Sequence, residues 1–310
     1  MNEEAETHTL DAGRHRLGPY VVGQRVVVRH LLSDGRATDV LGVCLAWGEE
    51  SLVLDTDGGH VEIALATVVT GKPVPPRPSV RARVPAREIE QRVLSLWPAD
   101  AVETEALGEW QLRAAVAAEV ADRRRANSVV AMGAPGVADA VDRVHEWYAA
   151  RGRRPQAQVV PGSDEEAGLL AHGWTPLPDG EAHCQLAAVS QALRTCNAVL
   201  LDRGVRSNSH HDEVTPRYME SGPRVVVDLP GARGEAALDG DWLGLHSIEV
   251  NSDRRRQGLG TAIVAYLLDW GAEQGARTAW LQVETANTAA VAAYARLTFR
   301  THHTYRFLTG

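Results

Sequence analysis

The residues with the most suggestive chemistry form the run 254–260, "RRRQGLG", between a strand-like segment and a helix-like segment. Gly258 and Gly260 have no Cβ, so an anion can come close to the backbone there. The first residues of the following helix should present unpaired amide N–H groups and the positive end of the helix dipole. Three arginines add positive charge. The run predicts a pyrophosphate site, and a tight strand-to-helix turn that only needs glycine for packing is the structural alternative.

The neighbouring sequence helps to distinguish a pyrophosphate site from a turn that needs glycine only for packing. No Gly-Lys-Ser/Thr follows the run, which excludes a Walker loop, and the third glycine of a dinucleotide fingerprint is missing. The string "VNSDRRRQGLGTAIVAYLLDW", followed by "LQVETANTAAVAAYARLTF", resembles the acyl-CoA motif pair of the GCN5-related N-acetyltransferase (GNAT) superfamily. The residues that match its two motifs, R/Q-x-x-G-x-G/A and an Asn-x-x-Ala run through Tyr to Phe, are Arg255, Gly258, Gly260, Asn287, Ala290, Tyr294 and Phe299.

This resemblance implies an enzyme that uses acetyl-CoA, and it implies roles for particular residues. Backbone groups of Ile248 and Val250, on a strand splayed from its neighbour, would pair with the pantetheine arm. Asn287 would contact the pantetheine region, and Tyr294 would donate a proton to the departing CoA thiolate. The residues whose amides or charge would hold the pyrophosphate are Arg255, Arg256, Gln257, Gly258, Leu259, Gly260 and Thr261.

Some of these residues have structural alternatives. Tyr294 could be a core tyrosine on an alanine-rich helix, although the motif register favours the catalytic role. Asn287 could be a helix N-cap, and both roles can coexist. Thr298 stands where the family has glycine, at the end of a helix, and a strained or reshaped turn is expected there.

The general base is less well defined, because its position varies within the superfamily. His246 and Glu249 lie on the strand before the phosphate run, and each is a candidate. A satisfied, half-buried side chain is the structural alternative for both. His210, His211 and Asp212 would line an acceptor pocket if their loop folded over the site. No set of residues has the spacing of metal ligands, so no metal is expected.

The chain has 310 residues, enough for two or three domains. Short strands with turn signals at 17–72 predict an SH3-like β-barrel, and the five-proline segment "KPVPPRPSVRARVP" predicts a linker after it. Alternating strands and helices follow, so the fold class is α/β (α+β) with mixed central sheets. Residues 84–195 resemble a degenerate N-terminal GNAT-like lobe that lacks a CoA-binding turn. Residues 222–310 resemble the catalytic C-terminal GNAT lobe. Residues 197–224 break the pattern and are predicted to be a long loop.

The barrel with two lobes resembles a group of actinobacterial GNAT proteins described as histone acetyltransferases. A primary amine is the expected acceptor, on a small molecule in preference to a lysine-bearing protein, because an acidic chain attracts cationic amines. A non-catalytic acyl-CoA-binding or interaction protein that uses the barrel is the rival from another class. The sequence leaves open the acceptor, the acyl chain and whether the chain forms a homodimer.

Overall composition excludes several classes. The net charge is −8, which argues against a general nucleic-acid binder. No apolar run reaches the roughly 18 residues of a membrane span, and the polar N-terminus has no signal-peptide pattern. Three widely spaced cysteines suit a reducing compartment. A cytoplasmic protein without a membrane partner is expected.

Overall fold

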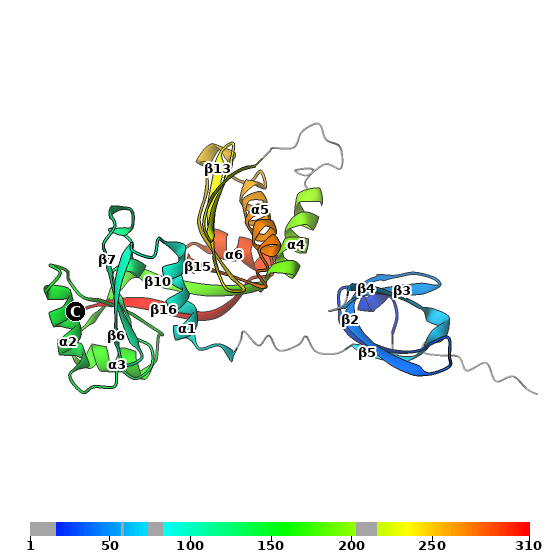
Figure 1. Ribbon diagram of the computed structural model, residues 1–310, viewed down its shortest axis with the longest axis horizontal. Helices are drawn as coiled ribbons and strands as arrows, with labels where there is room; N and C mark the ends of the chain where they lie inside the picture. Colours follow the sequence, from blue (N-terminus) through cyan, green and yellow to red (C-terminus); the bar gives the residue numbers. More distant parts are fainter. Residues whose placement is uncertain (1–16, 57–58, 74–82, 203–215) are drawn as a thin grey trace, which may run out of the picture. The chain divides into compact units, whose positions relative to one another are not determined.

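A computed structural model of the chain describes residues 17–56, 59–73, 83–202 and 216–310 (Figure 1). The chain divides into two compact units, one ending at Arg83 and one running Val84–Gly310. Each unit is described by itself. In the described part of the chain, no helix is both long enough and apolar enough to cross a membrane.

The first unit is a small antiparallel sheet with the strand order β4-β3-β2-β1-β5. Alternate residues of β1, such as Val26 and Val28, point into a core with Leu52 and Leu54 of β3. The predicted antiparallel strands are confirmed, but pairing between the edge strands β4 and β5, which would close a barrel, is absent from the described residues. Its elements are η1 (Pro19–Val21), β1 (Arg25–Leu31), β2 (Ala37–Trp47), β3 (Ser51–Thr56), β4 (Gly59–Ala64), η2 (Leu65–Thr67) and β5 (Val68–Pro73).

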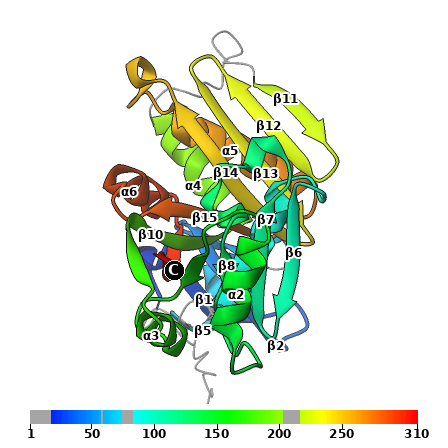
Figure 2. The same ribbon diagram turned by 90° about the vertical axis from the view of Figure 1, so that its left-hand side faces the viewer.

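The second unit is built on one continuous mixed sheet with the order β11-β12-β13-β14-β15-β10-β16-β9-β8-β7-β6 (Figure 2). Its ladders are antiparallel except β14 with β15 and β8 with β9, which are parallel. Its strands are β6 (Val102–Leu107), β7 (Trp110–Ala115), β8 (Val129–Val130), β9 (Gln156–Val159), β10 (Thr175–Ala188), β11 (Arg217–Ser221), β12 (Arg224–Leu229), β13 (Ala232–Asp239), β14 (Trp242–Val250), β15 (Thr278–Glu284) and β16 (Arg300–Thr309).

Helices cover the sheet. They are α1 (Ala86–Gln91), which continues as η4 (Arg92–Leu96), η5 (Ala118–Val120), η6 (Arg124–Ala126), α2 (Ala140–Ala149), α3 (Asp164–Ala171), α4 (Val189–Asp202), η7 (Ser252–Arg254), α5 (Leu259–Glu273) and α6 (Thr288–Arg296). Helices α4 and α5 lie side by side and share one apolar core with β12, β13 and β14 (Figure 1). The segment α1–η4 contacts β13 and β14 and contributes to a separate apolar cluster.

Two glycines let α5 lie close to the sheet. A Cβ on Gly234 of β13 would stand 2.3 Å from Cγ2 of Ile263 on α5. A Cβ on Gly271 of α5 would stand 2.5 Å from Leu243 of β14. Because such distances do not occur between real atoms, only glycine fits at both positions.

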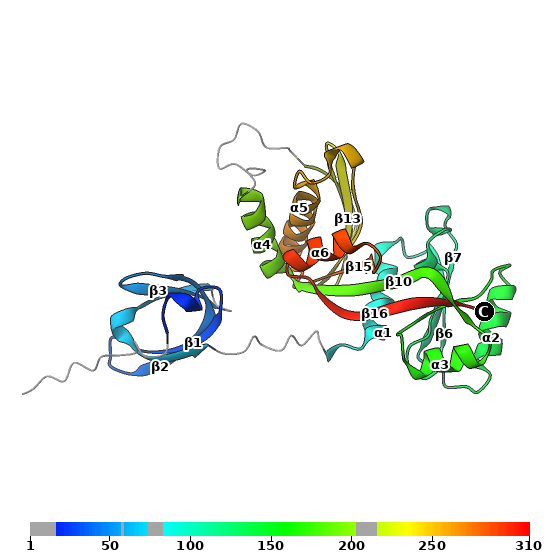
Figure 3. The ribbon, with the colours of Figure 1, turned by 180° about the vertical axis from the view of Figure 1, so that it is seen from behind.

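Two long strands, β10 and β16, lie side by side in the middle of the sheet (Figure 3). The last strand, β16, lies between β10 and β9, and it pairs with both. The prediction of a long loop over 197–224 is partly wrong, because α4 runs to Asp202 and Arg217–Ser221 is strand β11. Residues 203–215, including His210, His211 and Asp212, lie outside the described residues.

Candidate functional site

The site begins where β14 separates from β15. Their parallel pairing runs from Trp242 with Thr278 to Leu245 with Leu281 and then ends. Ser247 follows with φ of 49°, and the ladder of β14 with β13 shifts register at this point. Such a combination is a β-bulge, which bends a strand and changes its direction. The expected splay of β14 from its neighbour is confirmed.

The opened edge of β14 carries backbone groups that do not pair with β15. Asn251 N–H donates to Gly231 O at 2.9 Å, so residue 251 points its backbone groups at the β13 side. Backbone directions alternate along a strand, and the amide and carbonyl groups of Val250 and Ile248 therefore point to the opposite edge. In this structure Val250 O accepts a hydrogen bond from Arg255 Nε at 3.3 Å. An added strand-like ligand would find its hydrogen-bonding partners here.

The turn that follows β14 leaves the start of α5 uncapped by a side chain. Gly258, the N-cap residue, has φ of 86° and ψ of −6°, and no side chain bonds the first amides. Arg256 also has a left-handed φ, 66°. The N–H groups of Leu259, Gly260 and Thr261 thus depend on water or a ligand for partners. An anion at this position would gain those donors and the helix dipole.

Packing within the chain does not explain the glycine at 260. A Cβ at Gly260 would meet only Val250 Cγ2, at 3.6 Å, which is an ordinary contact. The helical position has no need of positive φ, and alanine is the better helix former. A small residue here, glycine or alanine in the motif, would leave room for a ligand to approach the backbone.

Some side chains of the turn form hydrogen bonds within it, and others are exposed to solvent. Arg254 Nε donates to Gln257 Oε1 at 3.1 Å, and Gln257 Nε2 donates to Asp253 O at 3.3 Å. These bonds hold the turn together, so the side chain of Gln257 is used internally. Arg255 and Arg256 are exposed and can meet an approaching diphosphate.

Tyr294 and Asn287 lie at the two ends of α6. Tyr294 is partly buried against the core of α4 and α5, and its ring meets Phe299 edge-on at 5.9 Å. Burial raises the pKa of Tyr294 to about 12, so the phenol is protonated at neutral pH, as a proton donor must be. Asn287 Oδ1 accepts from Ala290 N–H at 3.1 Å. The N-cap role of Asn287 is confirmed, and its amide NH₂ is not required for that role.

Thr298 occupies a strained turn after α6, as expected. Its φ is 70°, a conformation that costs a β-branched residue about 1–2 kcal/mol. Its hydroxyl is buried without a hydrogen-bond partner. Both features oppose folding at this one position.

Replacing Thr298 with glycine is expected to raise the free energy of unfolding by about 1 kcal/mol, since glycine adopts this φ without strain and removes the hydroxyl. Urea denaturation measures the change. Thr298→Ala, which removes the hydroxyl but keeps the Cβ, should gain less. A loss of stability in Thr298→Gly would show that the threonine is needed at this turn.

The bulge in β14 also places both candidate bases on one face. Leu245, Ile248 and Val250 face the core under α5, whereas His246 and Glu249 line a cavity on the other face. Residues three apart on a regular strand would point to opposite faces. Because the bulge adds one residue at 247, His246 and Glu249 point to the same face.

His246 is a weak base in this cavity. Its Nδ1 lies 3.1 Å from Ser247 Oγ and 3.9 Å from Glu235 Oε2. Burial, and then the positive charge of nearby arginines, lower the pKa of His246 to about 4. The ring is therefore neutral at pH 7. Glu249 is exposed on the same wall.

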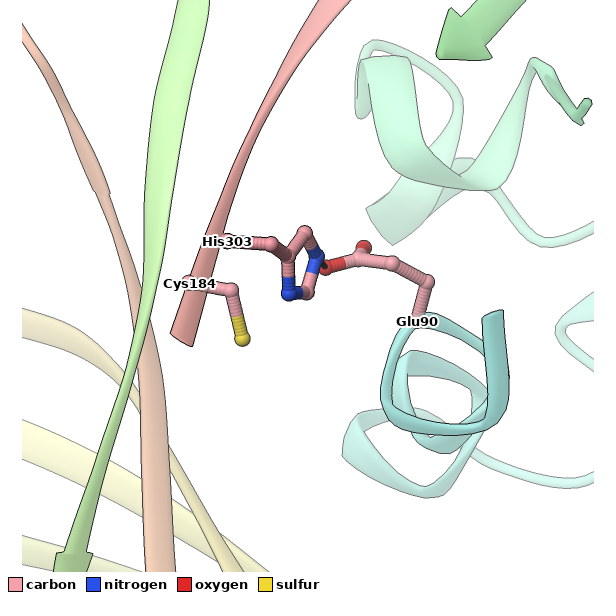
Figure 4. A group of neighbouring side chains, drawn as sticks. All are labelled: Glu90, Cys184 and His303. Atoms are coloured by element: carbon pink, nitrogen blue, oxygen red, sulfur yellow. Dashed lines mark hydrogen bonds and ion pairs between the residues drawn. The ribbon is translucent and has the colours of Figure 1, made fainter. Parts of the chain in front are cut away.

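A second group of reactive side chains lies at the junction of α1, β10 and β16 (Figure 4). Atoms of Glu90, Cys184 and His303 all lie within 4.8 Å of one another. The Glu90 carboxylate already accepts from His303 Nε2 at 2.9 Å, from Gln282 Nε2 at 2.6 Å and from Gln158. Burial raises the pKa of Cys184 well above its usual value, so a thiolate ligand is disfavoured. We interpret the group as a buried hydrogen-bond network.

Glu90→Gln is expected to destabilise the second unit by about 3 kcal/mol, because the new NH₂ group faces donors instead of accepting from them. Glu88→Gln, an exposed change on the same helix, is the matched control and should change stability by less than about 0.5 kcal/mol. Chemical denaturation compares the two. Equal stability of both variants would mean that Glu90 contributes nothing to the junction.

The splayed strand, the uncapped glycine turn and the helix that follows have the arrangement expected for the acyl-CoA side of a GNAT domain. Comparisons with known proteins find similarity to proteins named as acetyltransferases. Residues 230–308 match the family model described as "Probable histone acetyltransferase Rv0428c C-terminal". Residues 20–72 match "Rv0428c N-terminal Sm-like domain", so the small domain predicted as SH3-like is described there as Sm-like.

Among known proteins, the chain is similar to "Probable histone acetyltransferase Rv0428c" of Mycobacterium tuberculosis, with 28% identity over 93% of this chain and 95% of that protein. It is 44% identical over 55 residues to "[Ribosomal protein bS18]-alanine N-acetyltransferase" of Escherichia coli, which covers 18% of this chain and 37% of that protein. A GCN5-related N-acetyltransferase from Kribbella flavida aligns with a TM-score of 0.47 and 17% identity, covering 72% of this chain and 95% of that one.

Proposed function

We propose that the chain is an acetyl-CoA-dependent N-acetyltransferase that acetylates a primary amine by direct attack. The supporting observation is the opened edge of β14 beside the uncapped start of α5. Backbone groups for a pantetheine arm and backbone donors for a diphosphate meet there at one end of one strand. The exposed Arg255 and Arg256 add charge of the required sign.

Each part of acetyl-CoA would contact a different group of residues. Amides from Arg256 to Thr261 hold the diphosphate, with Arg255 beside them, and Gly260 leaves room for it. Ile248 and Val250 pair with the pantetheine arm, for which Arg255 Nε would release Val250 O. The amide NH₂ of Asn287 contacts the same arm while its oxygen continues to cap α6.

Acetyl-CoA supplies an acyl thioester to this site. The amine nitrogen forms a bond to the acetyl carbon, the C–S bond breaks, and the departing sulfur takes a proton from the Tyr294 hydroxyl. The nitrogen loses its remaining extra proton to solvent as the amide forms, and solvent returns a proton to the tyrosinate. The acceptor first loses a proton on the cavity side, where Glu249 and His246 lie. Burial and nearby arginines make His246 a weak base, so we assign the transfer to a water held between His246 and Glu249.

A small-molecule amine is the proposed acceptor, and an amine on a protein is the alternative. The cavity beside His246 has a volume of about 460 Å³, within the range of small-molecule sites. The printed names of two relatives, a probable histone acetyltransferase and a ribosomal-protein alanine N-acetyltransferase, favour the protein alternative. We also propose that the protein is cytoplasmic.

A free-thiol release assay with acetyl-CoA tests the function. Amino acids, polyamines, aminoglycosides and basic peptides form the acceptor panel. We expect thiol release above the rate of acetyl-CoA hydrolysis with at least one amine class. Binding of acetyl-CoA without thiol release with any amine would instead support a non-catalytic acyl-CoA-binding protein.

A further inference from the structure

The cavity beside His246 is formed by both lobes of the second unit. Strands β11 to β14 supply one wall, and residues 96–98 and 119–125 supply the facing wall. The apolar part includes Leu96, Trp97 and Val226. The lobe without a CoA turn therefore contributes directly to the space in which an acceptor would sit.

Three arginines and three glutamates line this cavity. They are Arg123, Arg125, Arg224, Glu119, Glu235 and Glu249. The ion pairs formed by the described residues include none between these arginines and a carboxylate. Glu235 instead lies 3.4 Å from Arg233 and 3.9 Å from His246. The cavity thus holds positive charge that the chain leaves unneutralised by direct contact.

One of the three arginines is held in place. Arg125 Nε donates to the Tyr305 hydroxyl at 2.7 Å, and its guanidinium carbon lies 5.9 Å from the Tyr305 ring centre. Arg224 is partly buried at the start of β12, and Arg123 is exposed at the cavity rim. A fixed inner arginine with two outer ones is an arrangement suited to a carboxylate or phosphate, which guanidinium groups bind with charge-assisted hydrogen bonds.

The same arginines affect His246. Burial is the first cause of its lowered pKa, and Arg123, Arg125 and Arg224 are the next. The carboxylates of Glu119, Glu235 and Glu249 face the same space. An anion placed among the arginines would offset their charge and raise the pKa of the ring. His246 would then become a stronger base when such an acceptor is bound.

We propose that the acceptor is a small amine that also carries an anionic group, as an amino acid does. Arg224, Arg123 and Arg125 hold the anionic group, and Glu235 and Glu249 receive the ammonium group before it is deprotonated. This inference rests on the proposed function, and it names the substrate class of that same site. It disfavours polyamines as acceptors, since their second ammonium group would lie among the arginines.

Matched pairs of acceptors test the inference. Each α-amino acid is compared with the amine that lacks only its carboxylate: lysine with cadaverine, ornithine with putrescine, and phenylalanine with phenethylamine. We expect kcat/KM for the preferred amino acid to exceed that of its partner by about 10-fold or more. Arg224→Gln and Arg123→Gln should narrow this ratio. Arg143→Gln, an exposed change on α2, is the control and should leave the ratio unchanged.

Calorimetry on the CoA-loaded protein compares the same pairs without requiring turnover. Tighter binding of carboxylate-bearing members supports the inference. Equal binding within pairs, tighter binding of the decarboxylated amines, or no binding by any amino acid would each overturn it. Those three results leave the proposed function standing if acetyl-CoA still binds and another amine is acetylated. Failure to bind acetyl-CoA would overturn both.

Discussion

Gly260→Ala is expected to raise the Kd for acetyl-CoA by about twofold to fivefold without weakening the fold, a modest change because the motif accepts glycine or alanine at this position. The added methyl group would contact only Val250 at 3.6 Å within the chain, so the protein accepts it. It would project into the space that a diphosphate needs to reach the first amides of α5. Calorimetric titration measures the Kd, and urea denaturation measures the stability, which should rise by about 0.5–1 kcal/mol.

A second helical glycine provides the matched control. A Cβ on Gly168, within α3, would meet nothing within 4 Å, and its φ is not in the left-handed region. Gly168→Ala should raise stability by a similar amount and leave the Kd for acetyl-CoA unchanged. If Gly260→Ala bound acetyl-CoA as tightly as the unaltered protein, the turn would need glycine for no ligand-related reason.

Tyr294→Phe is expected to lower kcat about 100-fold or more while the Kd for acetyl-CoA stays within about twofold, because only the proton donor is removed. The ring would keep its contact with Phe299 and its place against the core. Steady-state thiol release gives kcat, and calorimetry gives the Kd.

Tyr266→Phe is the control for this change, since Tyr266 is also partly buried against the same core. It should retain kcat. An unchanged kcat in Tyr294→Phe would assign the hydroxyl a structural role only, and proton donation would pass to water.

The turn before α5 and the cap of α6 could be predicted from the sequence because local rules dominate there. Glycines at 258 and 260 before an apolar helix, and asparagine at 287 before the next, act through backbone geometry and capping within a few residues. The left-handed turn at Thr298 was predictable for the same reason. These features depend little on the rest of the chain.

The cavity beside His246 depends on contacts that no local pattern encodes. His246 and Glu249 share a face only because Ser247 forms a bulge, and nothing in "LHSIEV" announces φ of 49° at a serine. Arg123 and Arg125 reach the cavity from a segment more than a hundred residues earlier. Their position beside β14 becomes visible only in the folded chain, where β6 to β16 form one sheet.

Strand β10 could not be predicted from its own sequence because it depends on long-range pairing. Strand β10 contains two prolines, a glycine and Asp179 with φ of 52°, so its sequence does not read as a strand. It forms because β15 and β16 pair with it on both sides. The Glu90 network has the same origin, since its members come from α1, β9, β10, β15 and β16.

Calorimetric titration with acetyl-CoA and with S-acetylpantetheine, which lacks the diphosphate, tests the central claim most directly. If amides flanking Gly258 and Gly260 hold the diphosphate, one acetyl-CoA should bind per chain, and S-acetylpantetheine should bind at least about 10-fold more weakly. No heat with acetyl-CoA, or equal affinity for the two thioesters, would contradict the account.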